Sequence, residues 1–311
     1  MRIAIYGVGG IGGYFGGRLA QAGHEVVFIA RGATLEALRR QGLRLESPKG
    51  DLHLPQVAAS DDPVAVGPVD LVMVAVKAWQ VAEVAEKIRP LLGPRTVVLP
   101  LQNGVEAPYQ LAETLGRERV LGGLAKIISY IVAPGHIRHL GAEPYIALGE
   151  LDNRPSERAE RIRATLEEAG IVARIPQDIV AALWLKFLFV AAWGGVGAAT
   201  RAPVGVLRRL PETRELLEQA MSEIATLAAA RGVSLPADAV ASSMNFVDAL
   251  PDDSTTSLQR DITEGRPSEL EAWSGAVVHL GREAGVATPV NGTLYRCLLP
   301  LELRARGQLG F

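Results

Sequence analysis

The chain is poor in cysteine and shows no imbalance of charge. One cysteine among 311 residues, Cys297, allows no disulfide within the chain, which fits a reducing compartment, and we expect the cytoplasm. The 32 basic and 34 acidic side chains give a formal net charge of -2. A nucleic-acid-binding protein would concentrate positive charge on one face, so we expect no nucleic-acid partner.

Long hydrophobic runs are also few. The apolar segment at residues 1–6 is too short for a signal sequence and predicts a first strand. The run 179–199 approaches the ~20 residues that a membrane span requires. Lys186 lies in its middle, where a charge would cost about 2.5–3.5 kcal/mol in a bilayer. We therefore predict a buried helix of a soluble protein there, and no membrane partner.

The first half of the chain alternates short apolar runs with helical patterns, which is typical of a mostly parallel sheet covered by helices. The predicted strands are 2–6, 25–30, 71–76 and 96–99, and the runs 136–139 and 145–148 are expected to extend the same sheet. A helix is predicted over 157–169, where Gly170 follows as a C-terminal cap. The predicted fold class of this half is α/β, of Rossmann-like type.

Helical periodicity replaces the strand pattern in the second half. The predicted helices cover residues 179–194, 211–231, 236–249, 267–284 and 293–304. We therefore predict two domains. Residues 1–172 form a Rossmann domain that binds the cofactor, and residues 173–311 form an all-α domain that carries the substrate and catalytic groups.

A glycine-rich turn follows the first predicted strand. Its residues are Gly7, Val8, Gly9, Gly10, Ile11 and Gly12. In a G-x-G-x-x-G turn between a strand and a helix, the glycines permit a tight turn, close approach of a pyrophosphate and close helix packing. The free N–H groups at the helix N-terminus favour an anion there. This turn predicts a bound dinucleotide.

Arg31 indicates which dinucleotide is bound. An acidic residue at the end of the second strand would hydrogen-bond the 2′-hydroxyl of NAD, but this strand is followed by Arg31 and Gly32. A guanidinium there suits a 2′-phosphate. The predicted cofactor is NADP(H), although a solvated loop arginine would give the same pattern.

Lys77 and Asn103 follow two further predicted strands, at the sheet edge where open α/β sheets bind ligands. Lysine and Asn-Gly are also ordinary in turns. Their shared position predicts that Lys77 helps to hold the adenosine phosphate and that Asn103 faces the nicotinamide and the substrate.

Apolar residues precede and follow Lys186 in the sequence, so its helix is apolar on nearly every face. One interpretation is a surface lysine whose stem covers apolar area while its amine reaches solvent. The other is a desolvated amine with a lowered pKa, able to donate a proton to a carbonyl near neutral pH. The second interpretation requires a carboxylate nearby to orient the amine.

Together these residues resemble a known family, the ketopantoate reductases (2-dehydropantoate 2-reductases). The segments that carry the resemblance are 7–12, Arg31, 76–80, 102–104, Trp184 with Lys186, Ser257 followed by Glu269, and 288–291. The resemblance runs through most of the chain. It implies a Rossmann domain, a helical second domain, an active site in the cleft between them, and NADPH-dependent reduction of a 2-oxo acid to a 2-hydroxy acid on the pathway to pantothenate and coenzyme A.

The resemblance also implies a role for individual residues. Lys186 matches the general acid that protonates the C2 oxygen as hydride arrives. Glu269 matches a carboxylate that contacts this network and the cofactor. Ser257 matches a substrate-binding hydroxyl, and Asn103 matches a contact shared by substrate and cofactor. Without the resemblance, Ser257 would be interpreted as a helix cap and Glu269 as a solvated acid.

The chain departs from the family pattern at three positions. Family members usually have asparagine at the positions of Val190, Gly194 and Val204, where it contacts substrate. Val190 and Gly194 lie four and eight residues after Lys186, on the same helical face. Loss of hydrogen-bonding groups weakens recognition of a hydroxylated substrate. Alternatives to 2-dehydropantoate are therefore a more apolar 2-oxo acid, or a non-catalytic NADP(H)-binding sensor of the same fold.

Other patterns are weaker. His136 and His139, if on a strand, do not share the face that a metal site would need, and no acidic or cysteine cluster completes a ligand set, so no metal is expected. Cys297 lies in an apolar stretch and is expected in the core. The apolar helices of the second half could form the interface of a homodimer.

Overall fold

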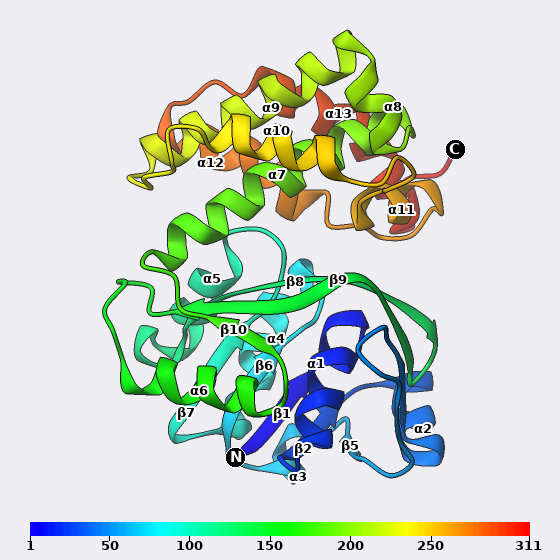
Figure 1. Ribbon diagram of the computed structural model, residues 1–311, viewed down its shortest axis with the longest axis vertical. Coiled ribbons are helices and arrows are strands. Elements are labelled where there is room, and N and C mark those ends of the chain that lie inside the picture. Colours follow the sequence, from blue (N-terminus) through cyan, green and yellow to red (C-terminus); the bar gives the residue numbers. More distant parts are fainter. The chain divides into compact units, whose positions relative to one another are not determined.

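The computed structural model describes residues 1–311 apart from the side chain of Ala142, and it divides into two compact units (Figure 1). The first unit comprises Met1–Gln102 and Glu106–Val180, and the second comprises Asn103–Val105 and Ala181–Phe311. The first unit is α/β and the second is helical, so the predicted fold class is confirmed.

A five-stranded parallel sheet forms the centre of the first unit. Its order is β5-β2-β1-β6-β7, and its strands are β1 (Arg2–Tyr6), β2 (Glu25–Ile29), β5 (Ala58–Ser60), β6 (Val69–Val74) and β7 (Leu92–Pro100). Successive side chains of each strand point to opposite faces, so Ile3 and Ile5 belong to one core and Ala4 and Tyr6 to another. A strand buried on both faces explains why β1 is apolar throughout.

Helices and a second sheet cover the two faces of the parallel sheet. The core of Ile3 and Ile5 includes side chains of α1 (Gly10–Gln21), α2 (Gly32–Gln41) and α6 (Glu157–Glu168). The core of Ala4 and Tyr6 includes side chains of α4 (Val81–Lys87) and α5 (Ala107–Leu115). Three short helices complete this unit, namely α3 (Pro63–Val66), η1 (Ala78–Gln80) and η2 (Arg89–Leu91), with a further turn η3 (Arg117–Arg119).

A second sheet of mixed direction contains the later strands. Its members are β3 (Leu43–Glu46), β4 (Leu52–Leu54), β8 (Gly122–Ala133), β9 (His136–Gly149) and β10 (Val172–Arg174). The prediction that 136–139 and 145–148 extend the parallel sheet is wrong, because both belong to the single strand β9. A tight turn with Gly135 at φ 73° joins β8 to β9, so the two strands pair antiparallel as a long hairpin (Figure 1).

The second unit is helical in the segments predicted. Its helices are α7 (Ile179–Thr200, which begins at the end of the first unit), α8 (Val204–Arg209), α9 (Pro211–Ala230), α10 (Ala239–Ala249), α11 (Ser257–Thr263), α12 (Ala276–Ala284) and α13 (Pro289–Ala305). The short helices α8 and α11 were not predicted. The predicted helix 267–284 begins instead with an irregular segment and a π-helical turn, η4 (Glu271–Gly275), before α12.

The helix α7 is long and apolar enough to cross a membrane by length and composition alone. Leu183, Phe187 and Leu188 on it are nevertheless buried, and its later turns pack against η4 and α11. These contacts account for its apolar composition as a core helix. The expectation that Cys297 is buried is wrong: α13 turns Leu294, Leu298 and Glu302 inward and leaves Cys297 exposed.

Candidate active site

The glycine-rich turn lies between β1 and α1, as predicted. Gly7 has φ 98°, and a Cβ placed there would lie 2.8 Å from Cγ1 of Val76. A Cβ at Gly12 would lie 2.0 Å from the carbonyl oxygen of Gly7, so this position also requires glycine. A Cβ at Gly9 would meet only Cδ1 of Ile131, at 3.9 Å. The space beside Gly9 is therefore open, which fits a turn that a pyrophosphate approaches.

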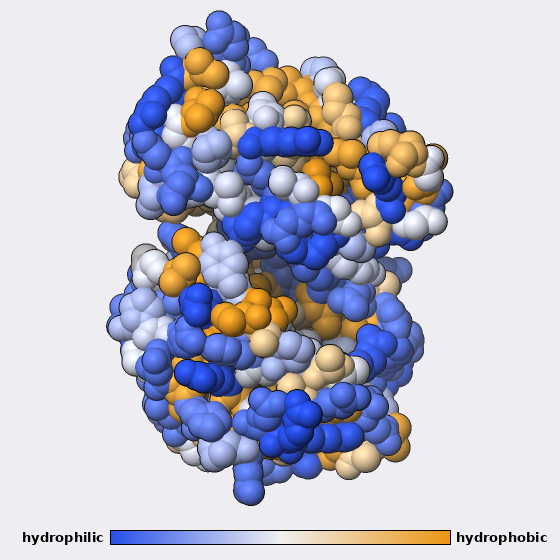
Figure 2. Space-filling model, turned by 90° about the vertical axis from the view of Figure 1, so that its right-hand side faces the viewer, coloured by the Kyte–Doolittle hydropathy of each residue, from blue (hydrophilic) through white to orange (hydrophobic). Residues whose placement is uncertain are grey.

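The β8–β9 hairpin lies beside this turn. A Cβ at Gly10 would lie 2.5 Å from Oγ of Ser129, so the hydroxyl of β8 is close to the first residue of α1. Ile131 of the same strand is the nearest side chain to Gly9. Neither neighbour could be predicted from the sequence, because the hairpin follows the turn by more than a hundred residues. Exposed apolar side chains of the hairpin are Ile128, Ile131, Val132 and Leu140, and apolar residues gather in the upper part of the first unit in Figure 2.

Backbone hydrogen bonds hold the loops together at the carboxyl edge of the parallel sheet. The N–H of Gly7 donates to the carbonyl of Ile29, at 3.0 Å, and the N–H of Ala75 donates to the carbonyl of Tyr6, at 2.8 Å. The glycine-rich turn therefore lies beside the loops that carry Arg31 and Lys77. The strand order reverses between β1 and β6, and such a reversal is where open α/β sheets bind ligands.

Arg31 is the residue before α2, and its side chain is exposed. Within the described part of the chain its guanidinium makes no hydrogen bond or ion pair. Its positive charge favours the ionised form of Tyr6, although burial raises the pKa of that phenol by more. An exposed guanidinium at the end of β2 fits a phosphate partner.

Lys77 and Asn103 follow β6 and β7 respectively. The Lys77 amine lies 5.7 Å from the centre of the Trp79 ring, and its backbone N–H donates to the Gln80 side chain at 3.2 Å. The Gln102 amide donates to the carbonyls of Val74 and Val76, at 2.9 and 3.1 Å, and so fixes the start of the Asn103 loop. Residues 103–105 group with the second unit, and a Cβ at Gly104 would lie 3.1 Å from the carbonyl oxygen of Ala272, in η4.

Lys186 lies on α7 among buried apolar neighbours. Trp184 and Phe187 are buried on either side of it and contact each other edge to face, with ring centres 5.7 Å apart. The Lys186 side chain itself is half-buried. A half-buried lysine on an apolar helix is partly withdrawn from water.

Glu269 lies two residues before η4 and is buried, with 7% of its surface exposed. The interpretation of Glu269 as a solvated acid is therefore wrong. Buried carboxylates are uncommon outside paired or functional settings, and π-helical turns such as η4 are frequent at functional sites. The backbone N–H of Trp273 donates to the carbonyl of Glu269 at 3.0 Å, which joins the residue to this turn.

A second buried carboxylate fixes the segment before Glu269. Glu302 of α13 accepts the backbone N–H of Ser268, at 3.0–3.1 Å, and also its hydroxyl. Arg306 donates to Glu302 at 2.6 Å and to the carbonyl of Ser268 at 3.1 Å. Ser268 is fully buried and Glu302 is 4% exposed. The backbone at position 268 is therefore held from both sides, and the residue after it is Glu269.

Ser257 is the first residue of α11 and is half-buried. The alternative interpretation of Ser257 as a helix cap is wrong, because Thr256 is the N-cap and its hydroxyl accepts the N–H of Gln259. The Ser257 hydroxyl is thus not used to start the helix, which leaves it to other partners.

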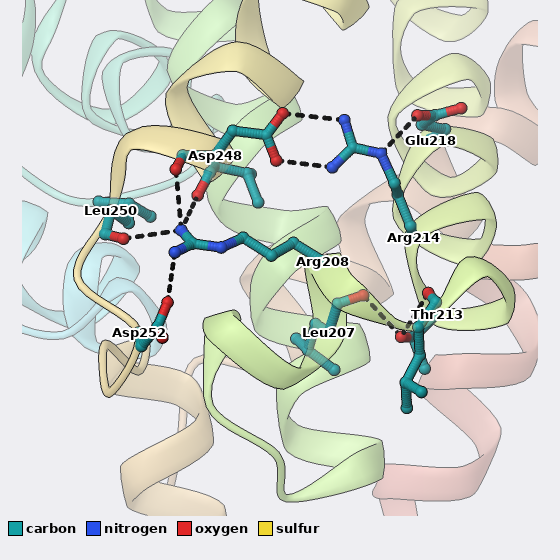
Figure 3. A network of polar contacts seen from close by, with 10 residues as sticks. Leu207, Arg208, Thr213, Arg214, Glu218, Asp248, Leu250 and Asp252 are labelled. Carbon is teal, nitrogen blue, oxygen red and sulfur yellow. Dashed lines mark hydrogen bonds and ion pairs between the residues drawn. The ribbon is translucent and has the colours of Figure 1, made fainter.

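The loop before Ser257 is anchored by Arg208 of α8 (Figure 3). Arg208 donates to three carbonyls at the end of α10, those of Val247, Asp248 and Leu250, at 2.7–3.0 Å. It also pairs with Asp252. Arg214 of α9 forms a two-point ion pair with Asp248, at 2.6 and 2.9 Å, and a longer one with Glu218 (Figure 3). These contacts tie the loop to α8 and α9.

The three positions without asparagine have different surroundings. Val190 is half-buried on the Lys186 side of α7. Gly194 is covered by Trp273, because a Cβ there would lie 2.6 Å from Cζ3 of the indole and 3.1 Å from Cδ2 of Leu258. Val204 is fully buried, and its N–H donates to the carbonyl of Ser254. Only Val190 is therefore placed to meet a ligand.

The two histidines of the 136–139 pair contact different side chains. His136 donates through Nε2 to the Glu46 carboxylate at 2.7 Å, and His139 is buried with its Nδ1 2.9 Å from the Ser47 hydroxyl. No group of three or more His, Cys, Asp or Glu side chains suited to a metal occurs among the residues that the structure describes.

Comparison with family models matches both halves of the chain. Residues 3–153 match the model of ketopantoate reductase PanE/ApbA, and residues 178–302 match that of ketopantoate reductase PanE/ApbA C terminal.

Individual relatives cover nearly the whole chain. The uncharacterized oxidoreductase YkpB of Bacillus subtilis is 32% identical, over 95% of this chain and 97% of its own. The 2-dehydropantoate 2-reductase of Nostoc is 32% identical, over 99% and 98%. The crystal structure of 2-dehydropantoate 2-reductase from Geobacter metallireducens GS-15 superposes with a TM-score of 0.90 at 34% identity, over 96% of this chain and 99% of that one.

Proposed function

The chain belongs to the ketopantoate reductase family of oxidoreductases, and we propose that it reduces a 2-oxo acid to the 2-hydroxy acid with NADPH. The first candidate for the substrate is 2-dehydropantoate, whose reduction gives pantoate for pantothenate and coenzyme A, because relatives carry that activity in their names. The proposal rests on one observation: the second unit contains both a half-buried lysine, Lys186, and a buried carboxylate, Glu269.

We assign cofactor binding to residues 1–172 and substrate binding to residues 173–311. Backbone N–H groups of the turn Gly7, Val8, Gly9, Gly10, Ile11 and Gly12 would hold the pyrophosphate at the start of α1. Arg31 would pair with the 2′-phosphate, and Lys77 would help to hold the adenosine phosphate. The open space beside Gly9 and the unpaired Arg31 support this assignment.

When bound, NADPH would supply hydride to C2 of the substrate. Lys186 would hydrogen-bond the C2 oxygen and give it a proton as negative charge develops there. Glu269 would orient the Lys186 amine and contact the cofactor. Asn103 and Ser257 would hold the substrate, and a fixed orientation lowers the entropy cost of the transfer.

We also propose a cellular compartment and an oligomeric state. A nicotinamide-dependent enzyme with a single cysteine fits the cytoplasm. We propose a homodimer, which analytical ultracentrifugation tests by measuring the mass in solution. The small-molecule partners are the 2-oxo acid and NADP(H).

The test is oxidation of NADPH, followed at 340 nm, with a panel of 2-oxo acids. We expect turnover with at least one acid, and a kcat about 10²–10⁴-fold lower in Lys186→Ala with little change in NADPH affinity. Tight NADPH binding without turnover on any acid would contradict the enzyme and favour an NADP(H)-binding sensor.

Cofactor choice has its own test. Arg31→Asp should shift the ratio of kcat/KM from NADPH toward NADH, because an acid repels the 2′-phosphate and accepts a 2′-hydroxyl. The exposed Arg161, on α6 of the first unit, provides a matched control in Arg161→Asp. An unchanged ratio in Arg31→Asp would mean that the 2′-phosphate is held elsewhere.

A further inference from the structure

The α7 surface that continues from Lys186 is apolar. Phe189, Val190 and Trp193 follow Lys186 by three, four and seven residues, so they lie on its side of the helix. Phe189 and Val190 are half-buried. The one polar atom among these three side chains, Nε1 of Trp193, is sealed from solvent. A ligand that contacts this surface therefore meets hydrocarbon.

One flank of this surface is closed by an indole. Trp273 and Leu258 cover Gly194, and both come from segments next to proposed site residues, since Leu258 follows Ser257 and Trp273 lies one turn after Glu269. Trp273 is 1% exposed, and its Nε1 has no partner in the part of the chain described. An amide at position 194 has no room here.

The other flank is aromatic. The ring of Phe246, from α10, meets that of Phe189 edge to face with centres 4.9 Å apart, and Phe189 also contacts Trp193 at 5.4 Å. Phe246 is 37% exposed, although large apolar side chains are usually buried. The half-buried Phe189 and the partly exposed Phe246 therefore give this flank an apolar surface.

We propose that the substrate of this chain carries a hydrocarbon group on its C2 carbonyl, branched or aromatic, which contacts Val190 and the Phe189–Phe246 pair. The inference rests on the proposed reduction of a 2-oxo acid by NADPH, and it replaces 2-dehydropantoate with a more apolar acid as the preferred substrate of that reaction. A hydroxyl on that group would lose its water contacts without a protein partner on α7. A methyl in its place would gain from burial.

The direct test compares two acids of equal size. 2-Dehydropantoate carries a hydroxyl at C4, and 3,3-dimethyl-2-oxopentanoate carries a methyl group in place of that hydroxyl. We expect kcat/KM of the wild-type enzyme with NADPH to be higher for the methyl compound by about 10-fold or more. A site built to bind the hydroxyl would reject the methyl compound by about 10⁴-fold. Equal values, or a preference for 2-dehydropantoate, would overturn the inference.

Val190 can be tested separately. Val190→Asn places an amide on the Lys186 side of α7, and we expect it to shift the ratio of kcat/KM toward 2-dehydropantoate by about 10-fold or more. Val190→Thr, which has nearly the same shape, should shift the ratio in the same direction if Val190→Asn folds poorly. Val206→Asn makes the same change at an exposed position of α8 and should leave the ratio unchanged. A ratio unmoved by both Val190 variants would remove Val190 from the substrate contact.

Binding without turnover separates this inference from the proposed function. N-propyloxamate and N-(2-hydroxyethyl)oxamate are non-reducible analogues that differ by methyl against hydroxyl. With NADPH bound, the propyl compound should have the lower Kd, measured by quenching of tryptophan fluorescence. If no 2-oxo acid is reduced but the propyl compound still has the lower Kd, the proposed reaction is wrong and the apolar binding site is supported. Tighter binding of the hydroxyethyl compound would overturn the apolar site.

Discussion

The indole of Trp273 occupies the space beside Gly194 that any side chain at position 194 would need. A Cβ there would lie 2.6 and 2.7 Å from two carbons of the ring, which real Cβ atoms essentially never do. Glycine on α7 and tryptophan on η4 therefore form one packing unit, and this unit closes the flank of α7 on which relatives are expected to have asparagine.

Gly194→Asn should destabilise the second unit by about 1–3 kcal/mol, the usual cost of overpacking a core. Urea unfolding followed by tryptophan fluorescence measures the change. Trp273→Leu should recover part of the loss in the double variant, because the smaller side chain makes room. A double variant no more stable than the additive sum of the single changes would contradict the proposed clash.

Gly9→Ala and Gly12→Ala should separate a binding role from a folding role. A Cβ at Gly9 meets only Ile131 at 3.9 Å, and the Gly9 backbone at φ -90° suits alanine. Gly9→Ala should therefore keep wild-type stability and raise the Kd for NADPH, measured by NADPH fluorescence, by about 10-fold or more, because the methyl blocks the pyrophosphate. Gly12→Ala should lower the unfolding midpoint, because its Cβ meets the Gly7 carbonyl. An unchanged Kd in Gly9→Ala would move the pyrophosphate away from this turn.

Glu302→Gln should weaken the hold on the segment before Glu269. A buried hydrogen bond to a charged group contributes about 1.5–3 kcal/mol, and Glu302 accepts several. Urea unfolding should show a loss of stability of that size. Glu218 is an exposed acid on α9 that pairs with Arg214, so Glu218→Gln should lower the stability far less. Equal losses in the two variants would argue against the buried clamp.

Tyr295 provides the pH test. Burial, together with the hydrogen bond that its O–H donates to the Glu271 carboxylate at 2.7 Å, raises the pKa of its phenol to about 12. Because the folded pKa exceeds the unfolded value of about 10, this group's contribution to stability is complete below pH 10 and is lost as the pH rises to 12.

The measurement is absorbance at 295 nm after a rapid pH jump, read before unfolding. The difference between wild type and Tyr295→Phe should titrate near pH 12, and Glu271→Gln should lower that midpoint. A difference that titrates near pH 10 would show that the phenol is neither buried nor bound to Glu271.

Local patterns in the sequence predicted much of this structure. The apolar run of β1 and the glycine-rich turn after it are both local, since a buried parallel strand and a G-x-G-x-x-G turn have composition signatures of their own. The spacing of apolar residues along α13 could also have predicted the exposure of Cys297. Inward side chains recur at Leu294, Leu298 and Glu302, and this period places Cys297 off the buried stripe.

Contacts between distant segments could not be predicted in the same way. The apolar runs 136–139 and 145–148 predicted strands, but their pairing depends on the tight turn at Gly135, which makes β8 the neighbour of β9. Ser268, the residue before Glu269, is held by Glu302 of α13 and by Arg306, which follows that helix. A pattern along one segment contains no record of such partners, so without the family resemblance the sequence predicts only a solvated acid at Glu269.

The measurement that tests the account most directly is transfer of deuterium from NADPH labelled at the reactive position of nicotinamide C4. The protein, the labelled cofactor and a 2-oxo acid are mixed, and the product is examined by mass spectrometry and NMR. We predict a 2-hydroxy acid with one deuterium on C2, formed about 10²–10⁴-fold more slowly by Lys186→Ala. No hydroxy acid from any 2-oxo acid, or a product without deuterium on C2, would contradict the account.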